Sequence, residues 1–214
     1  FLLKRKVNLH GYKSTEYIKD MGTPYRLLQI EKDIKNKRVD RLNYNNQKCA
    51  VFLDRDGVIN KEKGHISEIS QIQLIKGSAK AIREINKTGT LAICVTNQPV
   101  IARGECSLEN LKMIHNKIET LLGNEGAYLD DIFFCPHHPD SGFKGEIQNL
   151  KITCNCRKPE IGMILKAKDK HNINLDKSWL IGDTTSDMMT AKNARLQSIL
   201  VKTGYSGNDK KYNI

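Results

Sequence analysis

Short apolar runs alternate with amphipathic segments from Lys48 onward. Uninterrupted apolar runs are typical of buried strands, whereas apolar residues three and four positions apart are typical of helices. The predicted strands span 49–54, 91–97, 131–135, 179–183 and 198–202. The predicted helices span 78–87, 108–122 with Ser107 as N-cap, 162–171 and 187–194. This alternation predicts a doubly wound, Rossmann-like α/β domain whose parallel sheet of about five strands is covered on both faces.

The length of 214 residues suits one sizeable α/β domain with an appendage. The alternating pattern occupies residues 48–214, and the stretch from Gly11 to Pro24 is followed by a charged amphipathic segment. We therefore predict an N-terminal extension over residues 1–47 and one α/β domain over residues 48–214.

Polar and charged residues follow the predicted strands. Asp54 and Asp56 end the first strand, and Thr96, Asn97 and Gln98 end the second. Arg157 and Lys158 come after the third strand, and Asp183 and Asp187 follow the fourth. Ligands bind at the carboxyl ends of the strands in such sheets, so these side chains are expected to meet at one edge.

Clustered carboxylates repel one another unless a cation lies among them, and hard oxygen ligands suit Mg²⁺. A hydroxyl and a lysine beside them would hold the charge of a phosphoryl group while a carboxylate attacks phosphorus. A single acid at a strand end is more often a helix cap. Four strand ends with complementary chemistry instead favour a phosphoryl-transfer site.

A second cluster lies in the loop after the third strand. Cys135 and a histidine, either His137 or His138, precede Cys154 and Cys156. Three thiolates and one imidazole form a closed tetrahedral set, which is typical of structural zinc. A catalytic zinc would need an open position, and soft sulfur ligands match phosphate chemistry poorly. We therefore predict a zinc-bound loop that ends directly at Arg157.

The composition limits the alternatives. The formal net charge is +11, and residues 1–47 carry +6 of it, so most of the excess lies outside the predicted α/β domain. A solvated basic face is favoured over a nucleic-acid site, and aromatic residues make up only 6% of the chain. A zinc-stabilised nucleic-acid-binding module or a polynucleotide 3′-phosphatase remains the less favoured alternative. Without a long apolar run or a signal peptide, we expect a cytoplasmic protein that does not bind membranes.

Four segments carry a family resemblance. Residues 51–60 (VFLDRDGVIN), 95–98 (VTNQ), 157–159 (RKP) and 181–187 (IGDTTSD) resemble the motifs of the haloacid dehalogenase superfamily of phosphatases, over about residues 48–207. Within it, residues 101–104 (IARG) and the cysteine–histidine loop are similar to the D-glycero-D-manno-heptose 1,7-bisphosphate phosphatases. Histidinol phosphatases share much of this pattern. The resemblance implies a Mg²⁺-dependent phosphatase of a small phosphorylated sugar, without a large cap domain.

The resemblance also implies a role for each matching residue. Asp54 would be the nucleophile, and Asp56 the acid that later becomes the base. Thr96 and Lys158 would bind the phosphoryl group. Mg²⁺ would be held by Asp54, the Asp56 carbonyl and Asp183, with Asp187 in support. His137 would be the zinc-binding histidine beside Cys135, Cys154 and Cys156. Substrate contacts would come from Glu62, Lys63, Gly64, His65, Asn97, Gln98, Arg103 and Arg157.

The sequence departs from the family pattern at three places. Pro99-Val100 stands where Ser-Gly is common, Glu160-Ile161 follows the lysine motif, and Arg195 occupies a position where glycine often follows the last motif helix. None of these removes a reacting group. The first lies in the expected substrate loop, so substrate choice is less firmly implied than the reaction.

The two ends of the chain differ from the phosphatase pattern. Gly11–Pro24 and the following helix resemble the carboxyl-terminal end of a sugar nucleotidyltransferase, which implies a fusion of which this chain is a fragment, beginning at Phe1 without methionine. A simple helical extension is the alternative, because Gly-Thr-Pro is common at turns. A closing helix that is usual in the family is not expected after Gly207.

Overall fold

The computed structural model describes residues 16–36 and 38–214. The chain divides into two compact units, residues 1–46 and 47–214, and each is described by itself. Of the N-terminal stretch Gly11–Pro24, residues 11–15 lie outside the described residues.

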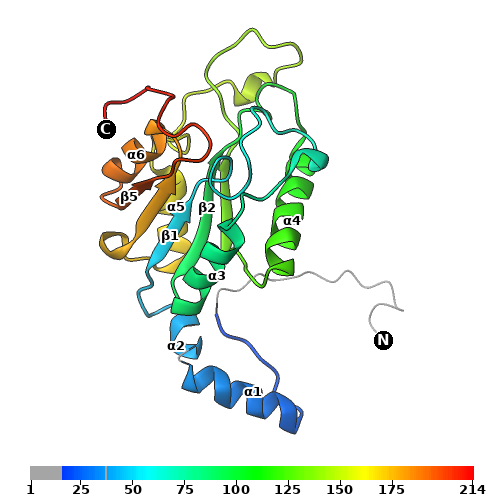
Figure 1. Cartoon of the computed structure of the whole chain (residues 1–214), viewed down its shortest axis with the longest axis vertical. Helices are drawn as coiled ribbons and strands as arrows, with labels where there is room; N and C mark the ends of the chain where they lie inside the picture. Colours follow the sequence, from blue (N-terminus) through cyan, green and yellow to red (C-terminus); the bar gives the residue numbers. More distant parts are fainter. Residues whose placement is uncertain (1–15, 37) are drawn as a thin grey trace. The chain divides into compact units, whose positions relative to one another are not determined.

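The larger unit is built on a parallel sheet in the order β3-β2-β1-β4-β5 (Figure 1). The strands are β1 (Ala50–Leu53), β2 (Leu91–Asn97), β3 (Asp131–Cys135), β4 (Trp179–Gly182) and β5 (Gln197–Leu200). The strand order reverses beside β1, so the first strand lies at the centre with β2 and β4 on its two sides. The predicted α/β fold with five parallel strands is confirmed.

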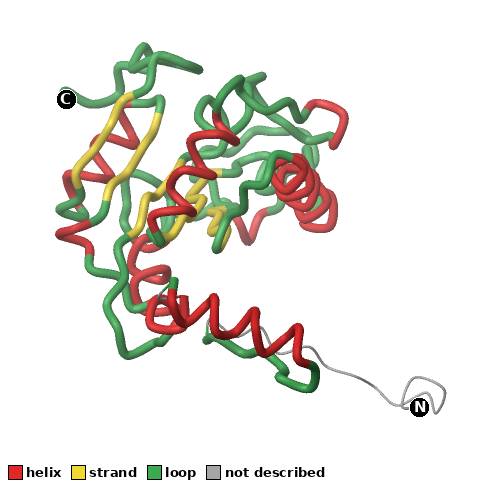
Figure 2. The backbone as a smooth tube through the Cα atoms, turned by 60° about the horizontal axis from the view of Figure 1, so that its bottom comes forward, coloured by secondary structure: helices red, strands yellow, loops and turns green. Residues whose placement is uncertain are grey.

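Helices cover both faces of the sheet (Figure 2). On one face, α3 (Ser78–Thr88) and α4 (Leu108–Asn124) pack against strand residues that include Leu53 and Cys94. On the other, α5 (Gly162–His171) and α6 (Thr185–Asn193) pack against Phe52 and Ile93. Successive residues of one strand thus enter opposite cores, which explains why these strands are apolar without alternation.

The sheet edge formed by β5 departs from the prediction. Ile199 is 44% exposed and Trp179, paired with Gln197, is 39% exposed. The expectation that the sheet is covered on both faces therefore holds for its centre and fails at this edge. The apolar run from Ser198 predicted a buried strand because burial at an edge depends on neighbouring elements, which the local pattern does not contain.

The helix ends follow from their caps. The Ser107 hydroxyl accepts a hydrogen bond from the Asn110 amide at 3.0 Å, as predicted for an N-cap. Helix α6 begins at Thr185, two residues before the predicted start, because Thr184 and Asp187 form a capping box. It ends before Arg195, whose φ of 57° is the left-handed conformation that favours glycine.

The connections contain little regular structure. The segments 54–77 and 136–161 hold only the 3₁₀ helices η2 (Ile69–Gln71) and η3 (Gln148–Leu150), and η4 (Leu175–Lys177) precedes β4. The expected absence of a large cap domain agrees with these short segments.

The smaller unit contains α1 (Pro24–Lys35) and α2 (Arg38–Leu42). Thr23 caps α1, with proline at its first position, and Asp33 accepts hydrogen bonds from Tyr17 and Lys19. In the described part of the chain, no helix has the length and apolar character needed to span a membrane.

Candidate active site

A cleft of about 430 Å³ opens at the carboxyl ends of the strands. Its lining brings together residues from all four predicted strand-end motifs, which is the convergence expected for a doubly wound sheet. The charged and polar side chains that line it are Asp54, Asp56, Glu62, His65, Thr96, Asn97, Gln98, Arg157, Lys158, Asp183, Thr184, Ser186, Tyr205, Asp209 and Lys211.

Lys158 lies between two carboxylates at the floor of this cleft. Its ammonium is 2.6 Å from Asp187 Oδ1 and 2.8 Å from Asp54 Oδ1, and all three side chains are almost wholly buried. Burial alone would lower the pKa of Lys158, but Asp187 and Asp54 more than reverse this and raise it. The lysine therefore carries a fixed positive charge beside Asp54.

The main chain of Lys158 is also held. Its amide donates to Asn97 Oδ1 at 2.9 Å, and Asn97 Nδ2 donates back to the Lys158 carbonyl at 3.1 Å. The preceding Thr96 is buried and accepts from Gln98 at 2.8 Å. The end of β2 thus fixes the position from which the lysine reaches Asp54.

Asp54, Asp183 and Asp187 present carboxylate oxygens within 4.8 Å of one another, and all three residues are buried. Burial, only partly opposed by Lys158, raises the pKa of Asp54 to about 8, and burial likewise raises the pKa of Asp183 to about 6. The buried Asp183 Oδ1 has no hydrogen-bond partner among the described residues. Oxygen ligands with an unpartnered buried atom fit a hard divalent cation such as Mg²⁺.

The other oxygen of Asp183 is held by the C-terminal segment. The Tyr205 amide donates to Asp183 Oδ2 at 2.7 Å, and Thr203 donates to the Gly57 carbonyl at 2.6 Å. Gly57 and Gly204 both have positive φ, and a Cβ on either would overlap the Asp183 carboxylate. Glycine at these two positions lets the backbone close around the aspartate.

Asp56 is oriented by three neighbours. Arg55 donates through Nε and Nη2, the latter at 2.7 Å, while Asn60 Nδ2 donates at 2.8 Å and Gln98 Nε2 at 3.1 Å. Arg55 is 1% exposed, and its Nη1 is buried without a partner among the described residues. Sequence reasoning missed Arg55 and Asn60. The sequence Asp54-Arg55-Asp56 could have predicted Arg55, because a cation next to two carboxylates at a strand end favours an ion pair.

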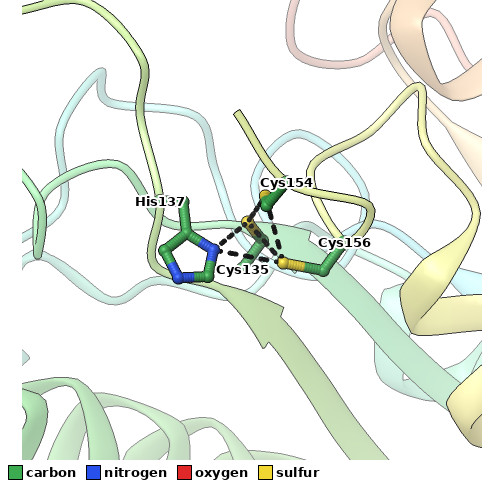
Figure 3. Close-up of side chains that lie close together, drawn as sticks. All are labelled: Cys135, His137, Cys154 and Cys156. Carbon is green, nitrogen blue, oxygen red and sulfur yellow. Dashed lines mark hydrogen bonds between the residues drawn. The ribbon is translucent and has the colours of Figure 1, made fainter. Parts of the chain in front are cut away.

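The cysteine–histidine loop forms a compact cluster (Figure 3). Cys156 Sγ lies 3.1 Å from Cys135 Sγ, 3.3 Å from Cys154 Sγ and 3.3 Å from His137 Nδ1. These separations are too long for a disulfide and near the roughly 3.7 Å edge of a tetrahedron with Zn–S bonds of about 2.3 Å. His138 instead faces Arg103, whose Nη2 lies 3.2 Å from its Nε2. Among the two histidines, His137 is the one that completes the donor set.

Two expected substrate residues lie outside the cleft lining, Lys63 and Arg103. Arg103 stacks on Phe143 at 4.4 Å and contacts His65 and His138. Arg157 does line the cleft, and its Nη1 donates to the His137 carbonyl at 3.2 Å. The cysteine–histidine loop therefore contacts the residue that immediately precedes Lys158.

The C-terminal segment forms part of the lining through Tyr205, Asp209 and Lys211. Sequence reasoning did not identify these residues. They have no apolar periodicity. Asp209 is held by its own carboxylate, which accepts from Thr185, whereas Tyr205 and Lys211 are held by main-chain amides, whose hydrogen bonds residue types do not reveal.

Comparison with known proteins gives consistent matches. Residues 155–213 match the HAD-hydrolase-like family. The chain is 40% identical over 156 residues to a D-glycero-β-D-manno-heptose-1,7-bisphosphate 7-phosphatase of Yersinia pestis, covering 72% of this chain and 81% of that protein. An Escherichia coli K12 protein of the same name is 38% identical, with 72% and 80% covered.

A solved structure matches over a similar range. It is the D,D-heptose 1,7-bisphosphate phosphatase from B. bronchiseptica complexed with magnesium and phosphate. The identity is 31% and the TM-score 0.65, with 74% of this chain and 83% of that chain covered.

Proposed function

The chain belongs to the haloacid dehalogenase-like phosphatases, and we propose that it removes the 7-phosphate of D-glycero-β-D-manno-heptose 1,7-bisphosphate. The observation that carries the proposal is the buried group of Asp54, Lys158 and Asp187 on the floor of a cleft that also contains Asp183. The names of the Y. pestis and E. coli relatives support the substrate.

In the first step, Asp54 attacks phosphorus and the bond between phosphorus and the sugar oxygen breaks. Asp56 donates a proton to that oxygen, so the sugar leaves as an alcohol. Thr96 and Lys158 bind the oxygens of the transferring group, where the lysine charge stabilises the developing negative charge. The contact of Lys158 with Asp54 at 2.8 Å supports this assignment.

In the second step, water attacks phosphorus of the aspartyl-phosphate and the bond to the Asp54 carboxyl oxygen breaks. Asp56 takes the proton from that water and so returns to its starting state. The hydrogen bonds from Arg55, Asn60 and Gln98 hold its carboxyl group in place at the cleft that Asp56 lines.

The carboxylates of Asp54 and Asp183, with the Asp56 carbonyl, would hold Mg²⁺. When bound, the ion supplies positive charge that offsets the repulsion among the carboxylates and the phosphate. Asp187 is already engaged by Lys158 at 2.6 Å and by Thr184 Oγ1 at 2.5 Å, so its proposed role is to position the lysine.

We assign zinc to Cys135, His137, Cys154 and Cys156 in a structural role. The set is closed, and its connection to the cleft passes through the hydrogen bond between Arg157 and the His137 carbonyl. Loss of the ion would therefore disturb Arg157 before it disturbs Asp54.

Substrate contacts are proposed for the predicted residues that line the cleft, Glu62, Gly64, His65, Asn97, Gln98 and Arg157. A cytoplasmic location and a fused nucleotidyltransferase domain also stay proposals, drawn from the sequence.

Phosphate release from three substrates tests the proposal: heptose 1,7-bisphosphate, histidinol phosphate and a 3′-phosphorylated oligonucleotide. We expect the heptose bisphosphate to have the highest kcat/KM, and Asp54→Asn to lower it by roughly 10³-fold or more. Faster turnover of histidinol phosphate would instead support the histidinol phosphatase alternative. Undiminished activity of a folded Asp54→Asn variant would show that Asp54 is not the nucleophile.

A further inference from the structure

The two phosphates of the proposed substrate require two sets of cationic contacts. A phosphomonoester carries a charge of about −1.5 to −2 at neutral pH. Of the cationic side chains that line the cleft, Lys158 is enclosed between Asp54 and Asp187 at its floor. Lys158 is therefore placed to bind the reacting phosphate. The other phosphate needs a cationic partner elsewhere in the cleft.

Two further cations line the cleft, Arg157 and Lys211. They also line an adjoining hollow of about 330 Å³, together with Asn97, Lys158, Ser186 and one acid, Glu160. Among the described residues neither Arg157 nor Lys211 forms an ion pair, and the Asp209 carboxylate, which also lines the cleft, accepts hydrogen bonds from Thr185. Both cations are therefore available to an anionic ligand that lies beside Lys158.

Lys211 is held at this place by a clasp between the C-terminal segment and the start of α6. Asp209 accepts from the Thr185 amide and the Thr185 hydroxyl, both at 2.7 Å. The amides of Lys211 and Tyr212 donate to Thr185 Oγ1 at 3.1 and 3.2 Å. Thr185 is buried and its own neighbour Thr184 caps the helix that carries Asp187. The clasp thus fixes the Lys211 backbone relative to the catalytic floor.

We propose that Lys211 is a specificity residue, which binds the non-reacting phosphate of the sugar bisphosphate together with Arg157. The inference rests on the proposed function. An exposed ammonium gives a point charge that adapts to the phosphate, whereas the Arg157 guanidinium, anchored on the His137 carbonyl, gives directed donors. No motif of the phosphatase resemblance includes Lys211.

The test compares Lys211→Gln with Lys210→Gln. Lys210 is its exposed neighbour in the same segment and lines neither hollow, so it is a matched control. Each variant is assayed with heptose 1,7-bisphosphate and with heptose 7-phosphate. For Lys211→Gln we expect KM for the bisphosphate to rise roughly 3- to 10-fold with kcat unchanged, because one exposed charge-assisted contact is lost. The monophosphate kinetics and the Lys210→Gln variant should match the wild type.

Equal kinetics of the two variants with the bisphosphate would overturn the inference. An equal change for both substrates would also overturn it, because Lys211 would then act on the reacting phosphate or on the fold. Absence of wild-type turnover of heptose bisphosphate would refute the proposed function, and the inference with it. Wild-type turnover thus reports on the function, and the ratio between variants reports on Lys211.

Discussion

Replacement of Asp187 by asparagine removes the negative charge of this side chain and nearly preserves its shape, so it tests the role of the charge. Its Oδ1 lies 2.6 Å from the Lys158 ammonium, and its Oδ2 accepts from the Thr184 hydroxyl at 2.5 Å and the Thr184 amide at 3.1 Å. Both oxygens thus face donors. An asparagine has only one oxygen, so its amide nitrogen would face either the ammonium or the Thr184 donors.

The expected loss of stability follows from burial. The Lys158 side chain is 4% exposed and that of Asp187 is 0% exposed. Removal of one partner from a buried ion pair costs about 3–5 kcal/mol. Asp54, at 2.8 Å, still pairs with the lysine, so we expect the lower end, about 3 kcal/mol. For a domain of this size that lowers Tm by roughly 6–12 °C.

We also expect Asp187→Asn to lower kcat. With Asp187 neutral, Asp54 alone pairs with Lys158, so we expect the lysine to hold the proposed nucleophile more tightly. We expect kcat to fall by about 10²-fold, which corresponds to roughly 2.7 kcal/mol in the barrier. Thermal melting followed by circular dichroism and steady-state phosphate release provide the two measurements.

Asp176→Asn is the matched control, because it removes an exposed acid from η4. Its Tm and kcat should equal those of the wild type. The reasoning would be refuted by an Asp187→Asn variant whose Tm lies within about 2 °C of the wild type and whose kcat is unchanged. Such a result would mean that Lys158 needs only one buried carboxylate.

Three further predictions concern other parts of the molecule. Burial lowers the pKa of His115 to about 4, below its ordinary value of 6.5. Between these pH values the unfolded chain binds a proton at His115 and the folded chain does not. The free energy of unfolding therefore decreases as the pH falls from 6.5 to 4. In His115→Leu, the free energy of unfolding measured with urea should fall by about 3 kcal/mol less than in the wild type between pH 6.5 and pH 4. An equal pH dependence of the two proteins would contradict the lowered pKa of His115. Gly204→Ala should abolish Mg²⁺ binding measured by calorimetry, because its Cβ would overlap the Asp183 carboxylate. Gly77→Ala is the control: Gly77 has a φ of 92° and open space around it, so this variant should bind Mg²⁺ and lose only about 1 kcal/mol of stability to backbone strain. Cys156→Ser should lower both the zinc content and Tm, and Cys49→Ser, outside the cluster, should leave the zinc content unchanged; equal zinc in both variants would exclude the proposed site.

The sequence predicts which residues meet at the floor of the cleft, and the reason is physical. Uninterrupted apolar runs such as 91–97 mark strands buried on both faces, and parallel strands end at a common edge. Residues at or beyond the ends of these strands, Asp54, Thr96, Lys158 and Asp183, are therefore expected near one another, and all four line the cleft. Local pattern and global topology supply the same answer here.

Two parts of the site escape this logic. Arg55 follows the first strand directly, at a position where a charged side chain is normally expected in solvent. It is buried instead, and its guanidinium forms an ion pair with Asp56. The segment from Thr203 to Lys211 contacts Gly57, Asp183 and Thr185 through the side chains of Thr203 and Asp209 and through the main-chain amides of Tyr205 and Lys211. Hydrogen bonds of the backbone are available to almost any residue, so residue types do not predict them.

The division between the buried floor of the cleft and its more exposed wall has a functional consequence. Asp54, Lys158, Asp183 and Asp187 are buried, whereas His65, Arg157 and Lys211 are more exposed and lie at the cleft wall. A change among the buried residues of the floor alters charges that cannot be replaced by water, so it should lower kcat. A change at the cleft wall alters contacts to the remote part of the substrate, so it should act on KM and on the choice between phosphorylated sugars. The same cleft floor can therefore serve different phosphate esters when only the cysteine–histidine loop and the C-terminal segment differ.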